Sequence, residues 1–382
     1  MGRVDNFLEE RKEKGLLRAL RPAGSRDEGR IRFSGRDLID FSSNDYLGLS
    51  SHPALREASI RAVEQFGTGS GAARLLSGDL KLHHELEEKT ARFKAREAAL
   101  VFNSGYQANV SVIPTLAGRG DAVFSDRLNH ASILDGIRLS GAKMFRFDHN
   151  DADHLEFLLK TERGKFKEAL IVSETVFSMD GDMAPLAALV HLKERYACAF
   201  LTDEAHATGI YGDNGSGMVE EAGLTGKVDL VMGTFSKALG SFGAYIACTT
   251  QMKEYLINAC GGFIYSTALP PSVIAANIAS LEVVRSEPFR RTTLLENAKY
   301  FRDGLSDRGL PVRGNSPIVP LIVGDNARAV ELSRTLEKRG YRVPPIRPPT
   351  VPIEESRLRF TITYYHSKDI LERLLHDLVE IC

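Results

Sequence analysis

The 382-residue sequence has no tryptophan, only four cysteines and no excess of either charge. The four cysteines are scattered and form no C-x-x-C pair, which gives no indication of a metal site and favours reduced thiols in a cytoplasmic protein; they are Cys198, Cys248, Cys260 and Cys382. With 49 basic and 50 acidic residues, the net charge of -1 gives no electrostatic footprint for nucleic acid or an acidic membrane surface. We therefore expect neither as a partner.

Long apolar runs are missing as well. No stretch approaches the roughly 18 consecutive apolar residues of a membrane helix. Charges such as Arg3, Glu9 and Lys12 interrupt the first twenty residues, so these lack the apolar core of a signal peptide. Internal repeats and low-complexity segments are also absent. The default expectation is a soluble cytoplasmic enzyme.

Apolar runs alternate with helical patterns from residue 98 onward. The runs are 98–102, 122–125, 143–147, 170–173, 199–202, 230–232 and 244–248, and helical patterns near 105–117, 130–140, 151–161 and 185–196 separate most of them. This order predicts an α/β fold in which helices cover a large, mostly parallel seven-stranded sheet. Ligands of such sheets gather beyond the carboxyl ends of the strands. Ser104, His130, Glu174, Asp203 and Lys237 would lie there.

The pattern also predicts a division of the chain into three parts. We expect an N-terminal helix and extension at 1–50, a large ligand-binding domain at 51–280 and a small α+β C-terminal domain at 281–382. Residues 4–20 have the apolar spacing of an amphipathic helix, and Pro22 would end it. In the C-terminal part, apolar runs at 318–323, 341–343 and 358–362 alternate with helical patterns at 325–339 and 367–380.

The stretch 199–240 contains the residue types that pyridoxal 5'-phosphate (PLP) requires. Asp203 ends an apolar run and could keep a pyridine nitrogen protonated, and His206 follows three residues later. Lys237 lies among small residues, where a Schiff base with the cofactor would fit. Taken singly, Asp203 is equally well explained as a helix N-cap and Lys237 as a solvated surface charge. Their combination is what indicates a PLP site.

A second group of residues could bind the phosphate and the ring of such a cofactor. Residues 103–107 place a glycine where a strand turns into a helix, so backbone N–H groups could bind phosphate, and Thr234 and Ser236 could add hydroxyls. An ordinary strand-to-helix turn explains the pattern of 103–107 equally well. Tyr106 or His130 could stack on the ring, although a lone histidine is more often a structural residue.

Arginines in the last part of the chain could bind a carboxylate. Arg347 lies between prolines that fix the backbone, and Arg357 and Arg359 flank Leu358 in a strand pattern, so both lie on one face of the strand. A bidentate arginine suits the carboxylate of an amino acid. We favour the interpretation of Arg357 as a solvated charge on an edge strand, and we favour this interpretation less for Arg359.

Two motifs look like nucleotide-binding signatures but lack the required context. Residues 67–71 read G-x-G-x-G, yet they follow a helical pattern instead of a strand, so a dinucleotide fingerprint is not indicated. Residues 203–206 read Asp-Glu-Ala-His, as in a helicase box, but no G-x-x-x-x-G-K-[ST] phosphate loop precedes them. We expect a flexible glycine loop near a ligand for the first and discard the helicase interpretation of the second.

Motifs along nearly the whole chain resemble the α-oxoamine synthases, a family of fold type I PLP-dependent transferases. The shared stretches are Phe-Ser-Ser-Asn-Asp-Tyr-Leu-Gly-Leu-Ser (41–50), Asp-Arg-Leu-Asn-His-Ala-Ser (126–132), Val-Phe-Ser-Met-Asp-Gly-Asp (176–182), Asp-Glu-Ala-His (203–206), Thr-Phe-Ser-Lys (234–237) and Ile-Tyr-Ser-Thr (264–267). Residues 320–326 and 346–352 are more similar to the branch of the family that serves biotin synthesis. The resemblance implies decarboxylative condensation of L-alanine with a pimeloyl thioester of coenzyme A or acyl carrier protein. The alternative is a glycine C-acetyltransferase, which uses glycine and acetyl-CoA.

The resemblance also implies a role for each matching residue. Lys237 would be the Schiff-base lysine and the base, Asp203 the partner of the pyridine nitrogen and His130 the stacking ring. The other matches are His206 and Ser178 beside the phenolic oxygen; Ser104, Gly105, Tyr106 and Thr234 at the phosphate and ring; Ser266 and Thr267 from the other subunit of a homodimer; Asn44, Arg347 and Arg359 at the amino acid carboxylate; and Arg18 at the distal carboxylate of the acyl chain.

Overall fold

The computed structural model describes residues 2–382, which divide into two compact units. Unit 1 contains the chain up to Tyr46, Met179–Asp182 and Thr293–Cys382, and unit 2 contains Leu47–Ser178 and Met183–Thr292. The N-terminal segment was expected as a separate extension, but it belongs to the same unit as the C-terminal residues. The reason is that β3 (Arg36–Asp40) pairs in parallel with β12 (Tyr341–Arg342). Among residues 2–382, no helix is long and apolar enough to cross a membrane.

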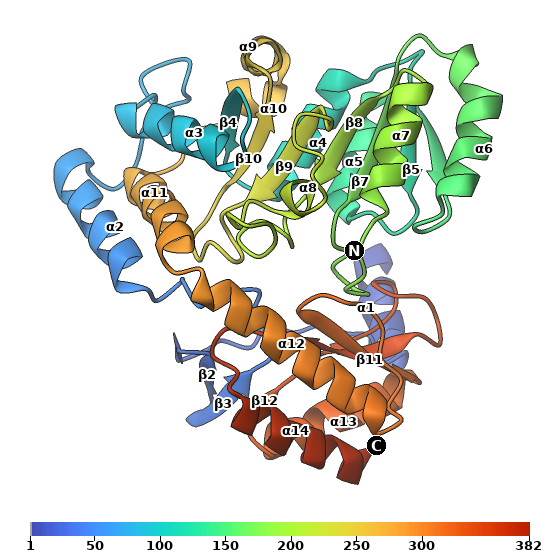
Figure 1. The fold of residues 1–382 in the computed structure, drawn as a ribbon. Helices are drawn as coiled ribbons and strands as arrows, with labels where there is room; N and C mark the ends of the chain where they lie inside the picture. Colours follow the sequence, from blue (N-terminus) through green and yellow to red (C-terminus); the bar gives the residue numbers. More distant parts are fainter. Residues whose placement is uncertain (1) are drawn as a thin grey trace. The chain divides into compact units, whose positions relative to one another are not determined.

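Unit 2 is built on a seven-stranded sheet with the strand order β4-β10-β9-β8-β7-β5-β6 (Figure 1). Its strands are β4 (Ala98–Phe102), β5 (Ala122–Asp126), β6 (Lys143–Phe147), β7 (Ala169–Glu174), β8 (Ala199–Asp203), β9 (Leu230–Thr234) and β10 (Ala244–Cys248). Strands β5 to β9 pair in parallel, and β10 is antiparallel to both of its neighbours. Every predicted apolar run is a strand, because helices bury most of these strands on both faces. The expected mostly parallel seven-stranded sheet is confirmed.

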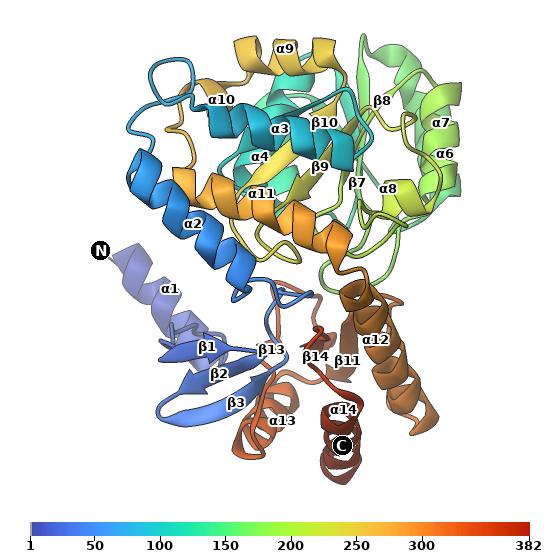
Figure 2. The same ribbon diagram turned by 60° about the vertical axis from the view of Figure 1, so that its left-hand side comes forward.

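Helices cover the two faces of this sheet. In Figure 2, α3 and α11 lie in front of the sheet and α4 lies behind it. Helices α4 and α5 pack on each other over a core that contains Leu100, Val112, Ile133 and Ile246. The helices of unit 2 are α2 (Pro53–Phe66), α3 (Lys81–Phe93), α4 (Gly105–Leu116), α5 (Ala131–Ser140), α6 (Ala152–Glu162), a 3-10 turn (Arg163–Lys165), α7 (Leu186–Arg195), α8 (Met218–Glu221), α9 (Thr250–Ala259), α10 (Gly261–Ile264) and α11 (Pro271–Ser286). Helix α12 (Phe289–Asp307) begins at the end of unit 2 and continues into unit 1.

Unit 1 contains two small sheets, with the strand orders β1-β2-β3-β12 and β11-β14-β13. The other strands of these sheets are β1 (Ser25–Asp27), β2 (Arg30–Phe33), β11 (Ile318–Gly324), β13 (Pro345–Ile346) and β14 (Ser356–Thr361). Unit 1 also contains the helices α13 (Asn326–Lys338) and α14 (Lys368–Ile381). The predicted strands and helices after residue 318 are all present. Helix α14 buries a stripe of leucines at helical spacing, namely Leu371, Leu374, Leu375 and Leu378.

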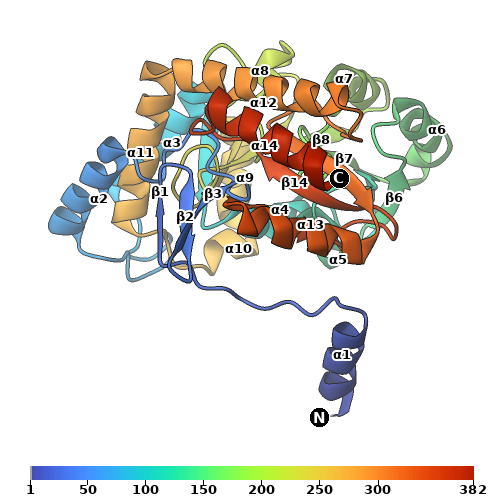
Figure 3. The same cartoon turned by 90° about the horizontal axis from the view of Figure 1, so that it is seen from below.

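The first helix is shorter than predicted. Helix α1 spans Gly2–Glu13 and ends well before Pro22, because Gly15 adopts a left-handed φ of 63° and stops the helical turn. None of its residues is buried, so no packed face extends the helix as far as the apolar spacing suggested. Figure 3 shows an extended stretch between α1 and β1.

Candidate active site

The carboxyl ends of β7, β8 and β9 line a cavity of ≈ 210 Å³ in unit 2. Its position agrees with the rule for ligands of parallel sheets. The cavity brings together most of the residues expected around the cofactor ring. It is lined by Gly105, Tyr106, Asn109, His130, Ser132, Glu174, Asp203, Ala205, His206, Met232, Thr234, Ser236 and Lys237.

Lys237 lies in the tight loop that follows β9, and its Nζ is 2.9 Å from Nε2 of His206. The loop is held by Thr234, whose hydroxyl donates to the carbonyl oxygen of Gly243 at 2.8 Å and accepts the N–H of Ser236 at 3.1 Å. The loop also needs Gly240, because φ is 64° there and a Cβ would lie 2.5 Å from a backbone nitrogen. These contacts fix the lysine beside the histidine.

Asp203 is the last residue of β8 and is 5% exposed. Its Oδ2 accepts a hydrogen bond from Nδ2 of Asn109 at 2.9 Å, and its Oδ1 accepts the N–H of Ala205 at 2.8 Å. Two donors therefore hold the carboxylate in one orientation. Asp203 is not a helix N-cap, because the next helix, α8, begins only at Met218.

Glu174 ends the neighbouring strand β7, directly opposite Asp203 in the strand register. Its Oε1 accepts the backbone N–H of His130 at 2.6 Å. Burial raises the pKa of the Glu174 carboxyl well above its usual range; the charge of Asp203 raises it further, and Lys237 partly offsets both. Burial also lowers the pKa of His130, which Asp203 opposes and Lys237 reinforces. Two groups of this cavity are thus biased toward their neutral forms.

Helix α4 begins at the cavity and follows β4. Ser104 caps the helix, because its hydroxyl accepts the N–H of Gln107 at 3.1 Å. The N–H groups of Gly105 and Tyr106 come next, and the first N–H groups of a helix have no partner within it. They form a ready site for a phosphate. The ring of Tyr106 meets the ring of His130 edge-on, with the centroids 6.5 Å apart.

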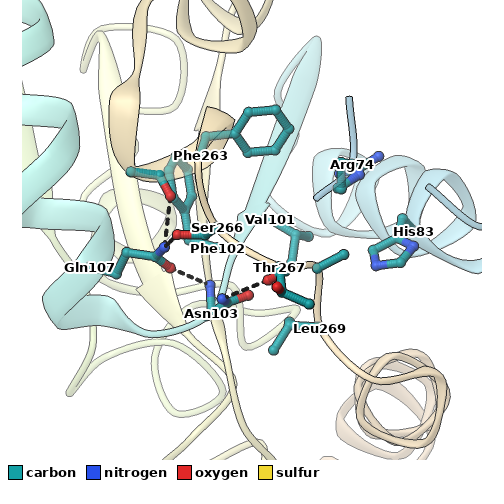
Figure 4. A pocket seen from close by; sticks show the side chains of 12 residues that line it. Arg74, His83, Val101, Phe102, Asn103, Gln107, Phe263, Ser266, Thr267 and Leu269 are labelled. Atoms are coloured by element: carbon teal, nitrogen blue, oxygen red, sulfur yellow. Dashed lines mark hydrogen bonds between the residues drawn. The ribbon is translucent and has the colours of Figure 1, made fainter. Parts of the chain in front are cut away.

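Four of the residues expected at the cofactor do not line this cavity, namely Ser104, Ser178, Ser266 and Thr267. Ser104 is the N-cap of α4. Ser178 lies in a turn after β7 and is partly buried. Ser266 and Thr267 line a separate pocket of unit 2 (Figure 4). There Nε2 of Gln107 donates to the Ser266 hydroxyl at 2.6 Å, and Nδ2 of Asn103 donates to the Thr267 carbonyl oxygen at 2.9 Å.

Asn44 and Arg359 lie together within unit 1. The guanidinium of Arg359 donates to Oδ1 of Asn44 at 3.3 Å and to the hydroxyl of Thr361 at 2.6 Å. Arg359 is 7% exposed, and burial lowers its pKa. The solvated position expected for Arg357 is wrong. Arg357 is fully buried and pairs with Asp180 at 2.7 Å and Glu355 at 2.8 Å, because β14 is the central strand of its sheet.

Arg18 and Arg347 are also neighbours within unit 1. Arg18 donates to the hydroxyl of Thr350 at 3.1 Å, and Arg347 donates to the carbonyl oxygen of Gly15. Burial lowers the pKa of Arg347, and the positive charge of Arg18 lowers it further. Two neighbouring positive charges favour the binding of an anion.

The sequence placed Glu174 at this edge of the sheet without a specific role and did not single out Asn109 or Ser132, and all three line the cavity. Asn109 lies one turn into α4 after Gly105. A polar residue on the buried face of an otherwise apolar helix was a usable signal, since buried polar groups need partners. The identity of its partners was not readable from the sequence.

The similarity of this chain to known proteins extends over nearly its whole length. Residues 36–378 match the family model described as aminotransferase class I and II. The chain is similar to the 8-amino-7-oxononanoate synthases of Geobacter sulfurreducens (48% identity over 377 residues, 98% of this chain and 96% of the relative) and of Pelobacter propionicus (46% over 384 residues, 98% of each).

Solved structures with the same fold include two kinds of synthase. A serine palmitoyltransferase from S. paucimobilis with a bound PLP-myriocin aldimine superposes with a TM-score of 0.92 at 30% identity, covering 99% of this chain and 96% of that chain. An 8-amino-7-oxononanoate synthase from Francisella tularensis superposes with a TM-score of 0.78 at 29% identity, covering 90% and 97%. These likenesses confirm the expected fold type I.

Proposed function

Because the chain belongs to the aminotransferase class I and II family and, within it, to the PLP-dependent 8-amino-7-oxononanoate synthases, we propose that it condenses L-alanine with a pimeloyl thioester. The products would be 8-amino-7-oxononanoate for biotin synthesis, CO2 and the free thiol carrier. The observation that carries this proposal is the meeting of Asp203, His206 and Lys237 in one cavity of a chain so similar to these synthases.

The residues of the cavity fit PLP. Lys237 offers an amine for a covalent link to its aldehyde, Asp203 a rigid carboxylate for its ring nitrogen, and the start of α4 an N–H cradle for its phosphate. When bound, PLP supplies the electron sink that lets a bond at the α-carbon of the amino acid break.

Two side chains of the cavity would handle protons. Lys237 can take the α-proton of alanine only as a neutral amine, and the ring nitrogen of His206 at 2.9 Å can share the proton of that amine. Asp203 must stay ionised to keep the cofactor ring protonated. The two hydrogen bonds from Asn109 and Ala205 hold its oxygens in one orientation.

Substrate binding falls on the arginines of unit 1. Arg359 is a buried cation beside Asn44, and a guanidinium is the natural partner of a carboxylate, so we assign this pair to the carboxylate of alanine. Arg18 and Arg347 are suited to the distal carboxylate of the pimeloyl chain, because each already lies in the positive field of the other. Acetyl-CoA has no such carboxylate, which argues for the pimeloyl reaction over the glycine C-acetyltransferase alternative.

We further propose a cytoplasmic homodimer with active sites at the subunit interface. All four cysteines are free thiols, as is usual in a reducing compartment. Ser266 and Thr267 do not line the cavity of their own chain but a separate pocket (Figure 4), so we assign them to the cofactor of a second copy.

Steady-state rates with two substrate pairs test the proposal. We expect the rate with alanine plus pimeloyl-CoA to exceed that with glycine plus acetyl-CoA, and mass spectrometry to find 8-amino-7-oxononanoate. A faster acetyl reaction would contradict it. Arg18→Ala together with Arg347→Ala is expected to raise KM for pimeloyl-CoA while leaving KM for alanine unchanged, and pimeloyl-acyl carrier protein in the same assay decides between the two carriers.

A further inference from the structure

A chain of buried polar side chains connects Asp203 to the ring of His130. Its middle members are Asn109 on α4 and Ser132 on α5, and both are fully buried. Nδ2 of Asn109 lies 2.9 Å from Oδ2 of Asp203 and 3.0 Å from Oγ of Ser132. Oγ of Ser132 lies 2.8 Å from Nδ1 of His130. One amide and one hydroxyl thus join two groups that face the cofactor cavity.

The chemistry of these groups fixes the direction of every hydrogen bond. An ionised carboxylate only accepts and an amide nitrogen only donates, so Asn109 cannot be turned around without placing its oxygen against Asp203. Ser132 Oγ accepts from Asn109, which leaves its single proton for His130. The backbone N–H of Ser132 also points at Nδ1 of His130, at 3.3 Å. This ring nitrogen is therefore an acceptor, and the neutral ring has its proton on Nε2.

We propose that Asn109 and Ser132 are positioning residues that hold Asp203 and His130 as one unit and keep the ring of His130 in its neutral Nε2–H form. The inference rests on the proposed function, in which His130 packs on a cofactor ring that Asp203 keeps protonated. A cationic imidazole there would repel the protonated ring. The lowered pKa of His130 agrees with a neutral ring.

A purely structural role would be served better by an apolar residue. Helices α4 and α5 approach so closely that a Cβ on Gly136 would lie 2.6 Å from the carbonyl oxygen of Asn109. In this tight contact Oδ1 of Asn109 is buried without a hydrogen-bond partner, which costs stability. Asn277 on α11 is an internal comparison: it is fully buried, donates to the Phe242 carbonyl oxygen at 3.0 Å and also has an unpaired Oδ1, but it does not line the cavity.

The test is a nuclear magnetic resonance measurement on the PLP-loaded enzyme labelled with 15N-histidine, with the His130 signals identified by their loss in His130→Gln. In the wild type we expect Nδ1 to resonate as an unprotonated and Nε2 as a protonated ring nitrogen from pH 6 to pH 8. Ser132→Ala is expected to allow protonation at Nδ1 and to shift the titration of the ring toward its ordinary pH, whereas Ser132→Thr, which keeps a hydroxyl, is expected to behave as the wild type.

Replacement of the Asn109 side chain should affect both Asp203 and His130, the two ends of this hydrogen-bonded series. Asn109→Leu is expected to allow protonation of His130 at Nδ1, as Ser132→Ala does. It is also expected to weaken PLP binding by about 10- to 150-fold, the usual effect of losing one hydrogen bond to a charged group. The matched control Asn277→Leu should change neither measurement. Ser280→Ala, which removes another fully buried hydroxyl, should also leave the His130 signals in place.

Two results would overturn the inference. The first is a proton on Nδ1 of His130 in the wild type, which needs no variant to fold. The second is an equal change in the Asn277→Leu control. The spectra are recorded without substrate, so the two claims can fail separately. If the protein is inactive with alanine and pimeloyl-CoA but His130 carries its proton on Nε2, the proposed function is refuted and this inference is not.

Discussion

Replacing Lys94 with methionine is expected to destabilise unit 2 by about 3–5 kcal/mol, because it leaves a buried charge without its partner. The ammonium of Lys94 contacts Oε2 of Glu204 and the carbonyl oxygen of Ser216. The other oxygen of Glu204 accepts the N–H of Val219 at 2.7 Å. The side chains of Lys94 and Glu204 are 2% and 0% exposed, so water cannot replace the lost contact.

The magnitude can be translated into a measurable shift. In a folding unit of about 250 residues, 1 kcal/mol changes the melting temperature by about 2–4 °C, so Lys94→Met should lower it by roughly 6–20 °C. Lys94→Met combined with Glu204→Leu removes both charges and should recover most of this loss. Because Glu204 directly follows Asp203, Lys94→Met should also weaken PLP binding.

The pH range of this contribution follows from the shifted pKa of Lys94. Burial is the largest single influence and would lower that pKa, but the charge and hydrogen bond of Glu204, together with Tyr245 and Glu220, outweigh it, so the net pKa is raised. A raised lysine pKa means that the stabilisation is complete below the ordinary lysine value and is lost only as the pH rises through the raised one. The effect of Lys94→Met should therefore be full at pH 7.

Thermal and urea unfolding of PLP-free protein, followed by circular dichroism, provides the assay. Lys89→Met is the control, since Lys89 makes an exposed pair with Glu282 at 2.9 Å and such pairs contribute about 0–1 kcal/mol. The reasoning is refuted if Lys94→Met is as mild as Lys89→Met, or if the double variant of Lys94 and Glu204 is less stable than the Lys94 single variant.

Three further predictions concern pH and packing. Burial raises the pKa of Glu174, so the unfolding free energy of the wild type should fall as the pH rises above the ordinary pKa of a carboxyl group. In denaturant titrations, Glu174→Gln should reduce this dependence of the unfolding free energy on pH, and an unchanged dependence would contradict the prediction. Burial lowers the pKa of His366 to about 3, so the unfolding free energy should fall by up to about 1.4 kcal/mol per pH unit as the pH drops below the ordinary histidine pKa. His366→Asn should remove this loss of stability in acid. Equal acid sensitivity of the two proteins would contradict the prediction. A Cβ on Gly233 would lie 2.2 Å from the Tyr245 hydroxyl, so Gly233→Ala should express as insoluble protein while Gly164→Ala, with open space around it, stays soluble; comparable yields would refute this.

The large sheet was predictable because its strands are buried on both faces and so form continuous apolar runs in the sequence. The cluster of Asp203, His206 and Lys237 was predictable for a related reason: parallel strands bring their carboxyl ends to one edge, and these residues follow two such ends. Ligand-binding roles for side chains could therefore be proposed from their positions in the chain alone.

Features that depend on distant partners were not predictable. The strands β1 to β3 are short and mostly charged, and the pairing of β3 with β12 joins residues almost a whole chain apart. Arg357 is buried because β13 covers the far side of its strand. Asn109 has a role only because it contacts Asp203, and no local pattern in the sequence predicts that the two residues lie close together.

Borohydride reduction of the PLP-loaded protein, followed by peptide mass mapping, tests the central claim most directly. We expect the reduced cofactor on Lys237 alone, and we expect Lys237→Ala to lose the visible absorbance of the bound cofactor while keeping the circular dichroism of the wild type. A label on Lys94, the buried lysine that pairs with Glu204, or an absorbance that survives in Lys237→Ala, would contradict the assignment of this cavity as the PLP site.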